Sequence, residues 1–223
     1  MIKLTPAIFV LLFLVRGNLR AIFAFGLALV SFAALGTLVV PWEYSIAFVE
    51  TLSQLGDRIL LSRINHSLES LIYLAWAWAT GLGQAGFAGF EWIVAPVWVS
   101  PLSRLIMLAG VGVGLWACQK LESHRVWAQT LIIALWPSFG GPMGWTHYLL
   151  LPLLLLPGLM AVLPIGKALV IILVLAAPFS VPVFSVLTAL DMPELLPTLW
   201  GMGWQIIAII GLSMLVLNSK NRH

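Results

Sequence analysis

Long apolar runs, separated by short polar turns, fill almost the whole chain. A membrane-spanning helix needs about 20 apolar residues, and residues 21–40 provide that length without interruption. The other apolar runs, several of them with prolines that would kink a helix, are 4–15, 105–118, 126–135, 149–163, 168–187 and 203–217. The pattern predicts an all-α fold, a polytopic transmembrane helical bundle of about seven spans that occupies residues 1–223 as a single domain.

Three segments between the early spans are too charged, too short or too broken to cross a bilayer. Residues 43–63 carry mixed charges, yet apolar residues recur there at helical spacing, which predicts a helix on the membrane surface. The spaced residues are Phe48, Leu52, Leu55 and Ile59. Residues 69–80 are apolar but short and end at a glycine-rich piece, which predicts a re-entrant or interfacial helix. The tryptophan-rich residues 87–101 are predicted to be a loop lying in the interface.

The segment 136–148 separates two strongly apolar runs and is rich in glycine and proline, so we predict that a helix breaks there. Its end contains Trp145, His147 and Tyr148. One interpretation is an interfacial turn whose aromatic side chains anchor at the headgroup level. The other is a functional site, in which His147 binds an anionic group or carries a proton.

The composition supports a membrane protein and excludes an ordinary soluble domain. The chain is 61% hydrophobic and 9% charged, with a mean hydropathy of +1.07, whereas soluble domains carry about 25% charged residues. Its net charge of +3 comes from basic residues scattered in short loops, so we expect no nucleic-acid partner. The single cysteine, Cys118, allows no intrachain disulfide, and we expect neither a metal nor a cofactor.

The charges also predict how the chain crosses the membrane, because basic residues collect on the cytoplasmic side. Seven spans place most of the basic residues inside, namely Arg16, Arg20, Lys120, Arg125, Lys167, Lys220 and Arg222. Most of the acids then lie outside, namely Glu43, Glu50, Asp57, Glu69, Glu91, Asp191 and Glu194. We therefore predict a bacterial inner-membrane protein with a cytoplasmic C-terminus and with both residue 65 and the 136–148 segment on the extracytoplasmic side. The first apolar run ends in two arginines rather than small residues, which favours uncleaved insertion.

Three further polar positions are candidates for substrate contacts. Lys3 lies at membrane level and suits a phosphate, although a terminal lysine also snorkels to water. Asn65-His66-Ser67 matches a glycosylation sequon and equally fits a polar loop that contacts substrate. Arg104, just before a predicted span, suits a phosphate at the lipid surface or again snorkels.

Three segments, in this order, resemble glycosyltransferase family 87, whose members are integral-membrane enzymes of the GT-C type that use polyprenyl-phosphate sugars. They are KLTP at 3–6 followed by RGNLRA at 16–21, NHSL at 65–68, and WPSFGGPMGWTHY at 136–148. The third departs from the family pattern, because Pro and Ser are exchanged and the glycine-rich piece is longer. The resemblance covers nearly the whole chain and corresponds to the C-terminal half of the family's pattern.

The resemblance implies roles for individual residues. Lys3, Asn65, Ser67 and His147 would contact the donor phosphate or the acceptor, and the aromatic side chains beside the histidine would shape the pocket. The family's general base is an acid in an earlier external loop, and none of this chain's acids matches it. The chain is then a fragment, a degenerate relative or a split product whose missing half comes from an upstream-encoded membrane partner.

Two functions follow from these observations. The first is a membrane glycosyltransferase, or its C-terminal half, that moves a sugar from a polyprenyl-phosphate donor in the bilayer to an acceptor on the extracytoplasmic face. The alternative is a non-catalytic component of membrane assembly or of lipid and envelope transport.

Overall fold

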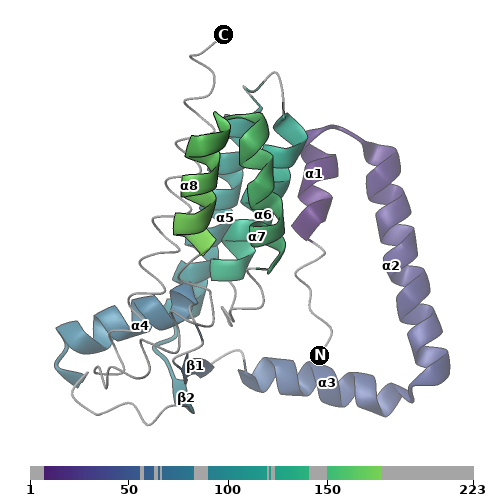
Figure 1. Ribbon diagram of the computed structural model, residues 1–223. Coiled ribbons are helices and arrows are strands. Elements are labelled where there is room, and N and C mark those ends of the chain that lie inside the picture. The colour runs from purple at the N-terminus through teal and green to yellow at the C-terminus, as the bar shows by residue number, and fades with distance from the viewer. Residues whose placement is uncertain are drawn as a thin grey trace. The chain divides into compact units, whose positions relative to one another are not determined.

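The computed structural model describes residues 8–55, 58–62, 65, 67–82, 90–119, 121, 124–140 and 150–176. Most of these residues are helical, and the chain divides into two compact units, Met1–Arg58 and Ile59–His223 (Figure 1). The prediction of a helical protein is therefore confirmed in its coarse form. Each unit is described by itself below.

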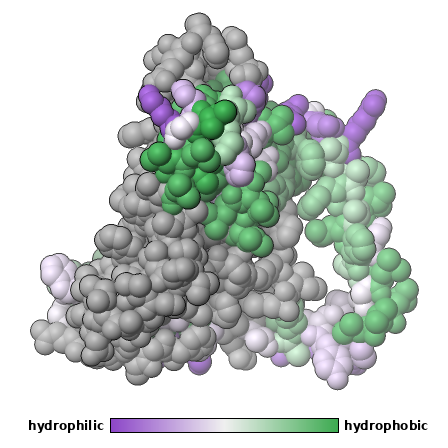
Figure 2. Space-filling view, in the orientation of Figure 1, coloured by the Kyte–Doolittle hydropathy of each residue, from purple (hydrophilic) through white to green (hydrophobic). Residues whose placement is uncertain are grey.

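The first unit consists of α1 (Val10–Val15), α2 (Leu19–Val39) and α3 (Trp42–Leu55). Helix α2 begins where the side chain of Asn18 accepts a hydrogen bond of 3.1 Å from the Ala21 amide. It is long and apolar enough to cross a membrane and buries none of its residues, as its apolar surface in Figure 2 illustrates. The predicted span at 21–40 agrees with this helix within two residues.

The second unit opens with a small sheet that the hydrophobic pattern does not predict. Strand β1 (Arg58–Ser62) pairs with β2 (Phe90–Val94). The surface helix predicted for 43–63 is therefore wrong beyond Leu55, and the loop predicted for 87–101 contains a strand and the start of a helix. The last four residues of β1 are all buried. A short apolar run that is buried on both faces has no alternation to distinguish a strand from a helix.

Helices form the rest of this unit: α4 (Leu68–Ala79), α5 (Val99–Cys118), α6 (Arg125–Gly140), α7 (Leu150–Leu155), the 3₁₀ helix η4 (Leu156–Ala161) and α8 (Ile165–Ala176). Figure 1 shows the last four α-helices gathered into one bundle. Among the described residues, α2 and α5 are the two helices long and apolar enough to cross a membrane.

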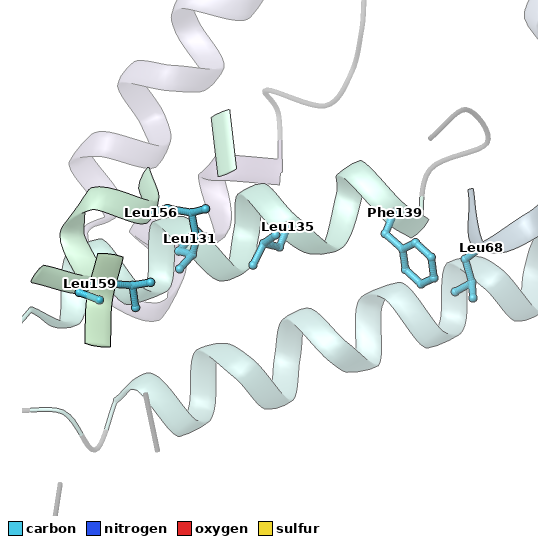
Figure 3. Packing of buried hydrophobic residues seen from close by; sticks show 7 residues of the cluster. Leu68, Leu131, Leu135, Phe139, Leu156 and Leu159 are labelled. Carbon is cyan, nitrogen blue, oxygen red and sulfur yellow. The ribbon is translucent and has the colours of Figure 1, made fainter. Parts of the chain in front are cut away.

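Glycines allow α5 and α6 to approach each other closely. A side chain at Gly110 would collide with the ring of Trp136, and one at Gly114 would lie 2.7 Å from Ile132. A neighbouring face of α6, about 100° around the helix, packs on residues of α4, η4 and α8 in a buried cluster. Figure 3 shows most of its members: Leu68, Leu131, Leu135, Phe139, Leu156, Leu159 and Ala168. The two faces together make α6 the most enclosed helix of the unit.

Three predicted boundaries in this unit are wrong. Helix α5 starts at Val99 rather than at 105, so Arg104 lies within the helix and not before it. Helix α6 continues through Pro137 to Gly140 instead of breaking at 136, and α8 begins at Ile165, before the start of the predicted apolar run at 168–187. Proline and glycine punctuate isolated segments, but burial on packed faces overrides such local preferences.

Candidate functional site

A buried polar cluster lies at the start of α4. Asn65 and Ser67 are both 0% exposed, and Ser70 is buried beside them. The side-chain amide nitrogen of Asn65 donates to the Leu60 carbonyl at 2.6 Å and to the Ser70 hydroxyl at 3.1 Å. The hydroxyl groups of Ser67 and Ser70 are 2.8 Å apart. The cluster is therefore a connected and buried hydrogen-bond network.

The local sequence explains this network. Ser67 caps α4, and its hydroxyl oxygen accepts a 3.2 Å hydrogen bond from the Ser70 amide. Serine favours this position because its oxygen satisfies one of the amides that a helix start leaves without a partner. The Ser70 hydroxyl also donates to the Leu60 carbonyl at 3.2 Å, so the network fixes α4 to strand β1.

Glu69 lies in the first turn of α4 and is only 1% exposed. The side chain of Ser100, the second residue of α5, makes a hydrogen bond with its carboxyl group, and Arg104, one helical turn further along α5, lies close enough to act on its charge. Among the described residues, its Oε1 atom has no hydrogen-bond partner. A buried carboxyl oxygen without a partner is uncommon in folded proteins.

Burial raises the pKa of the Glu69 carboxyl above its ordinary value, and this effect outweighs the hydrogen bond from Ser100 and the positive charge of Arg104, which both lower it. Desolvation favours the neutral form of an acid. A carboxyl group with a raised pKa and a free oxygen is suited to exchange a proton with a hydroxyl group, because its basicity is closer to neutral pH than that of an exposed glutamate.

The polar cluster and Glu69 lie at one end of the α5–α6 pair. Helix α4 contacts both α5 and α6. The hydroxyl of Ser103 donates to the Gly140 carbonyl at 3.4 Å, which joins the start of α5 to the end of α6. At their other end the two helices are connected by residues 119–124, which together with Arg125, the first residue of α6, are called the basic turn because they include Lys120 and Arg125. The cluster and the basic turn therefore occupy opposite ends of the pair.

The structure brings together three of the predicted site residues. Asn65 and Ser67 belong to one network, and Arg104, which is exposed, reaches the neighbouring Glu69 by its charge. Both Asn65 and Ser67 make internal hydrogen bonds, so they hold the shape of this corner. The other predicted residues, Lys3, Trp145, His147 and Tyr148, lie outside the described residues.

Glu69 is the residue that sequence reasoning missed. It was counted only as one of several extracytoplasmic acids. A glutamate in the first turn of a helix is usually a solvated group that favours the helix start. Its position two residues after the helix-capping Ser67 was visible in the sequence, but nothing in the pattern indicated that β1 and α5 would bury it.

These features define a mostly helical membrane protein with a buried polar corner at one end of its helix pair. The chain belongs to glycosyltransferase family 87, whose family model matches residues 1–139. The matched part contains Lys3, Asn65, Ser67, Glu69 and Arg104, whereas the segment with His147 lies beyond it. No curated protein and no solved structure matches the chain.

Proposed function

We propose that this chain is an integral-membrane glycosyltransferase that moves a sugar from a polyprenyl-phosphate donor to an acceptor hydroxyl on the extracytoplasmic face. The observation that carries the proposal is the family match over residues 1–139, which includes the whole polar corner around Glu69. Membership of a glycosyltransferase family supports sugar transfer. The apolar helices α2 and α5 support a substrate that reaches the site from the bilayer.

The proposed topology has about seven spans, a cytoplasmic C-terminus and a position in the bacterial inner membrane. The opposite placement of the polar corner and the basic turn at Arg125 supports it. Reporter fusions after Lys120 and Lys167 are expected to be cytoplasmic, and a fusion after Gly141 extracytoplasmic. A cytoplasmic signal from the Gly141 fusion would contradict this topology.

The chemistry requires stabilisation of the departing phosphate, which leaves as an anion. Cationic groups and hydrogen-bond donors in a water-poor site provide this stabilisation. We propose that Lys3, Arg104 and His147 act on the phosphate and that Trp145 and Tyr148 shape the pocket. Asn65 and Ser67 contribute by holding the corner in place, since their hydrogen bonds are internal.

The test is a transfer assay in membrane vesicles with radiolabelled polyprenyl-phosphate hexoses and pentoses. The chain is expressed alone and together with any membrane protein encoded upstream, which would be the partner if the chain is a split product. His147→Ala is expected to remove most of the transfer, because one lost donor to a developing anion costs about 2.7 to 4 kcal/mol of barrier.

The matched control is His124→Asn, at the basic turn between α5 and α6, where the backbone is left-handed (φ 56°) and asparagine is tolerated. It is expected to keep wild-type transfer. If no donor supports transfer with or without the partner, the proposed function is wrong and the non-catalytic alternative stands. If His147→Ala keeps full activity, the histidine has no part in the mechanism.

A further inference from the structure

We propose that Glu69 accepts the proton of the acceptor hydroxyl during glycosyl transfer. This inference rests on the proposed function and assigns the chain a carboxylate of its own for a step that the sequence analysis left to a partner. It starts from one observation: the side chain is almost fully buried, and its Oε1 atom has no partner among the described residues.

The surroundings of Glu69 explain why this oxygen is available. Helix α4 presents the carboxyl toward the start of α5, where the Ser100 side chain acts on it as a hydrogen-bonding group. The polar groups next to it in α4 are occupied, because Ser67 and Ser70 bind each other and Ser70 also binds the Leu60 carbonyl. No polar group of this network binds Oε1, so that atom is available to the hydroxyl group of the acceptor substrate.

Among the described residues, the elements next to Glu69 carry few charged groups, and on β1 the only one is Arg58, at the exposed end of that strand. On α5, Arg104 is the cation that acts on it. On α6, the only titratable side chain is Arg125, which lies at the opposite end of that helix. A carboxyl that served only to join α4 to α5 would be expected to have both oxygens bonded, because a buried polar atom without a partner destabilises the fold. The free Oε1 therefore favours a functional role.

The reaction step balances as follows. The oxygen of the acceptor hydroxyl forms a bond to the anomeric carbon of the sugar, and its proton moves to Oε1 of Glu69. The bond between the anomeric carbon and the phosphate oxygen breaks, and its electron pair stays on the polyprenyl phosphate. For this step Glu69 must be ionised, so a raised basicity helps only while the operating pH keeps part of the population deprotonated.

The experiment uses the vesicle assay described above and compares Glu69→Gln with Glu69→Asp. Glutamine keeps the size and the hydrogen bond to Ser100 but does not accept a proton, so kcat should fall about 10²- to 10⁴-fold while the KM for the donor lipid changes little. Aspartate keeps the carboxyl group and should restore part of kcat. The matched control is Glu91→Gln, an exposed glutamate on β2, which should transfer like the wild type.

The pH profile separates a proton acceptor from a positioning group. Wild-type kcat should rise with pH along an acidic limb, and Glu69→Gln should lack that limb. Ser100→Ala keeps Glu69 but removes a hydrogen bond that lowers its pKa, so the limb should move to higher pH. Ser100→Ala tests the role of Glu69 even if Glu69→Gln fails to fold. If Glu69 had only a structural role, the pH dependence of kcat would be the same in Ser100→Ala as in the wild type.

The possible failures are distinguishable. Wild-type transfer together with a folded Glu69→Gln variant that keeps kcat within about threefold would overturn the role of Glu69 and leave the proposed function intact, with the proton acceptor on the partner. An unchanged acidic limb in Ser100→Ala would also overturn it. Absence of transfer by the wild type, with or without the partner, would refute the proposed function and this inference together.

Discussion

Helices α2 and α5 have nearly the same length, 21 and 20 residues, and both are apolar enough to cross a membrane. Yet α2 buries no residue, whereas α5 buries several, among them Val99 against β1 and α4 and Cys118 against α6. Their glycines differ in the same way. Gly26 and Gly36 of α2 have open space around them, while Gly110 and Gly114 of α5 lie against the side chains of α6.

The difference teaches that apolar composition and helix packing are separate properties of a sequence. Lipid tails are as apolar as leucine, so an apolar helix needs no protein neighbour in a bilayer. Close packing requires small residues opposite large ones, as where Gly110 receives Trp136. In α5, Gly110 and Gly114 are four residues apart and share a face, whereas the two glycines of α2 are ten residues apart.

The largest expected effect tests this contrast directly. Gly110→Leu places a large side chain against Trp136 and should lower the free energy of unfolding by about 1–3 kcal/mol or more, as overpacking does. Gly26→Leu on α2 should be neutral or slightly stabilising, because leucine is a better helix former than glycine by roughly 0.8 kcal/mol. Unfolding in mixed detergent micelles, followed by tryptophan fluorescence, measures both.

Gly112→Leu is the control within α5 itself, because Gly112 has open space around it. It should behave like Gly26→Leu and not like Gly110→Leu. Equal losses for all three variants would show that glycine matters here for helix flexibility and not for contact with α6.

The apolar pattern predicted the helices well where a run was long and uniform. The span at 21–40 agrees with α2, and the short helix at 69–80 agrees with α4, whose cap and glycine-rich end are local signals. The pattern failed where distant contacts decide the structure. Residues 59–62 form a strand because β2 and the polar network hold them, and Pro137 stays inside α6 because neighbours enclose that helix.

In the candidate site, too, residues involved in local interactions were predicted from the sequence, whereas a residue placed by distant contacts was not. Asn65 and Ser67 were found from a short motif, and the helix cap that Ser67 forms is a local interaction. The burial of Glu69 depends on β1 and on the start of α5, which begins thirty residues later in the chain. Single-sequence reasoning identifies residue types that suit a phosphate or a sugar, but it does not show which carboxyl group will be enclosed.

The second prediction concerns the pH dependence of stability at the polar corner. Burial raises the pKa of Glu69 above its ordinary value of 4.5, so between pH 4.5 and the folded pKa the folded protein holds a proton that the unfolded chain releases. The stability from that proton is complete below 4.5 and is lost as pH rises through the folded pKa. Glu69→Gln has no such loss. Between pH 4.5 and the folded pKa, its free energy of unfolding should therefore rise relative to that of the wild type by about 1.4 kcal/mol per pH unit.

Thermal unfolding of the two proteins at several pH values checks this, with Glu91→Gln as the exposed control. The stability difference between Glu69→Gln and the wild type should shrink as pH approaches 4.5 and widen above it. A difference that does not vary with pH would contradict a raised pKa and would mean that solvent reaches the carboxyl group.

The smallest expected effect compares the two helix caps, one in each unit. Ser67 caps α4 inside the buried network, and Asn18 caps α2 in an exposed position. Losing a cap costs about 0.5 to 2 kcal/mol. Ser67→Ala should lie near the upper end of that range, because it also takes a partner from Ser70 and from the amide of Asn65, whereas water replaces the lost bond in Asn18→Ala. Denaturant unfolding of both variants measures the difference. Equal losses of unfolding free energy would mean that water reaches the polar cluster around Glu69 as readily as it reaches the start of α2. The hydrogen bonds of the cluster would then be no stronger than exposed ones.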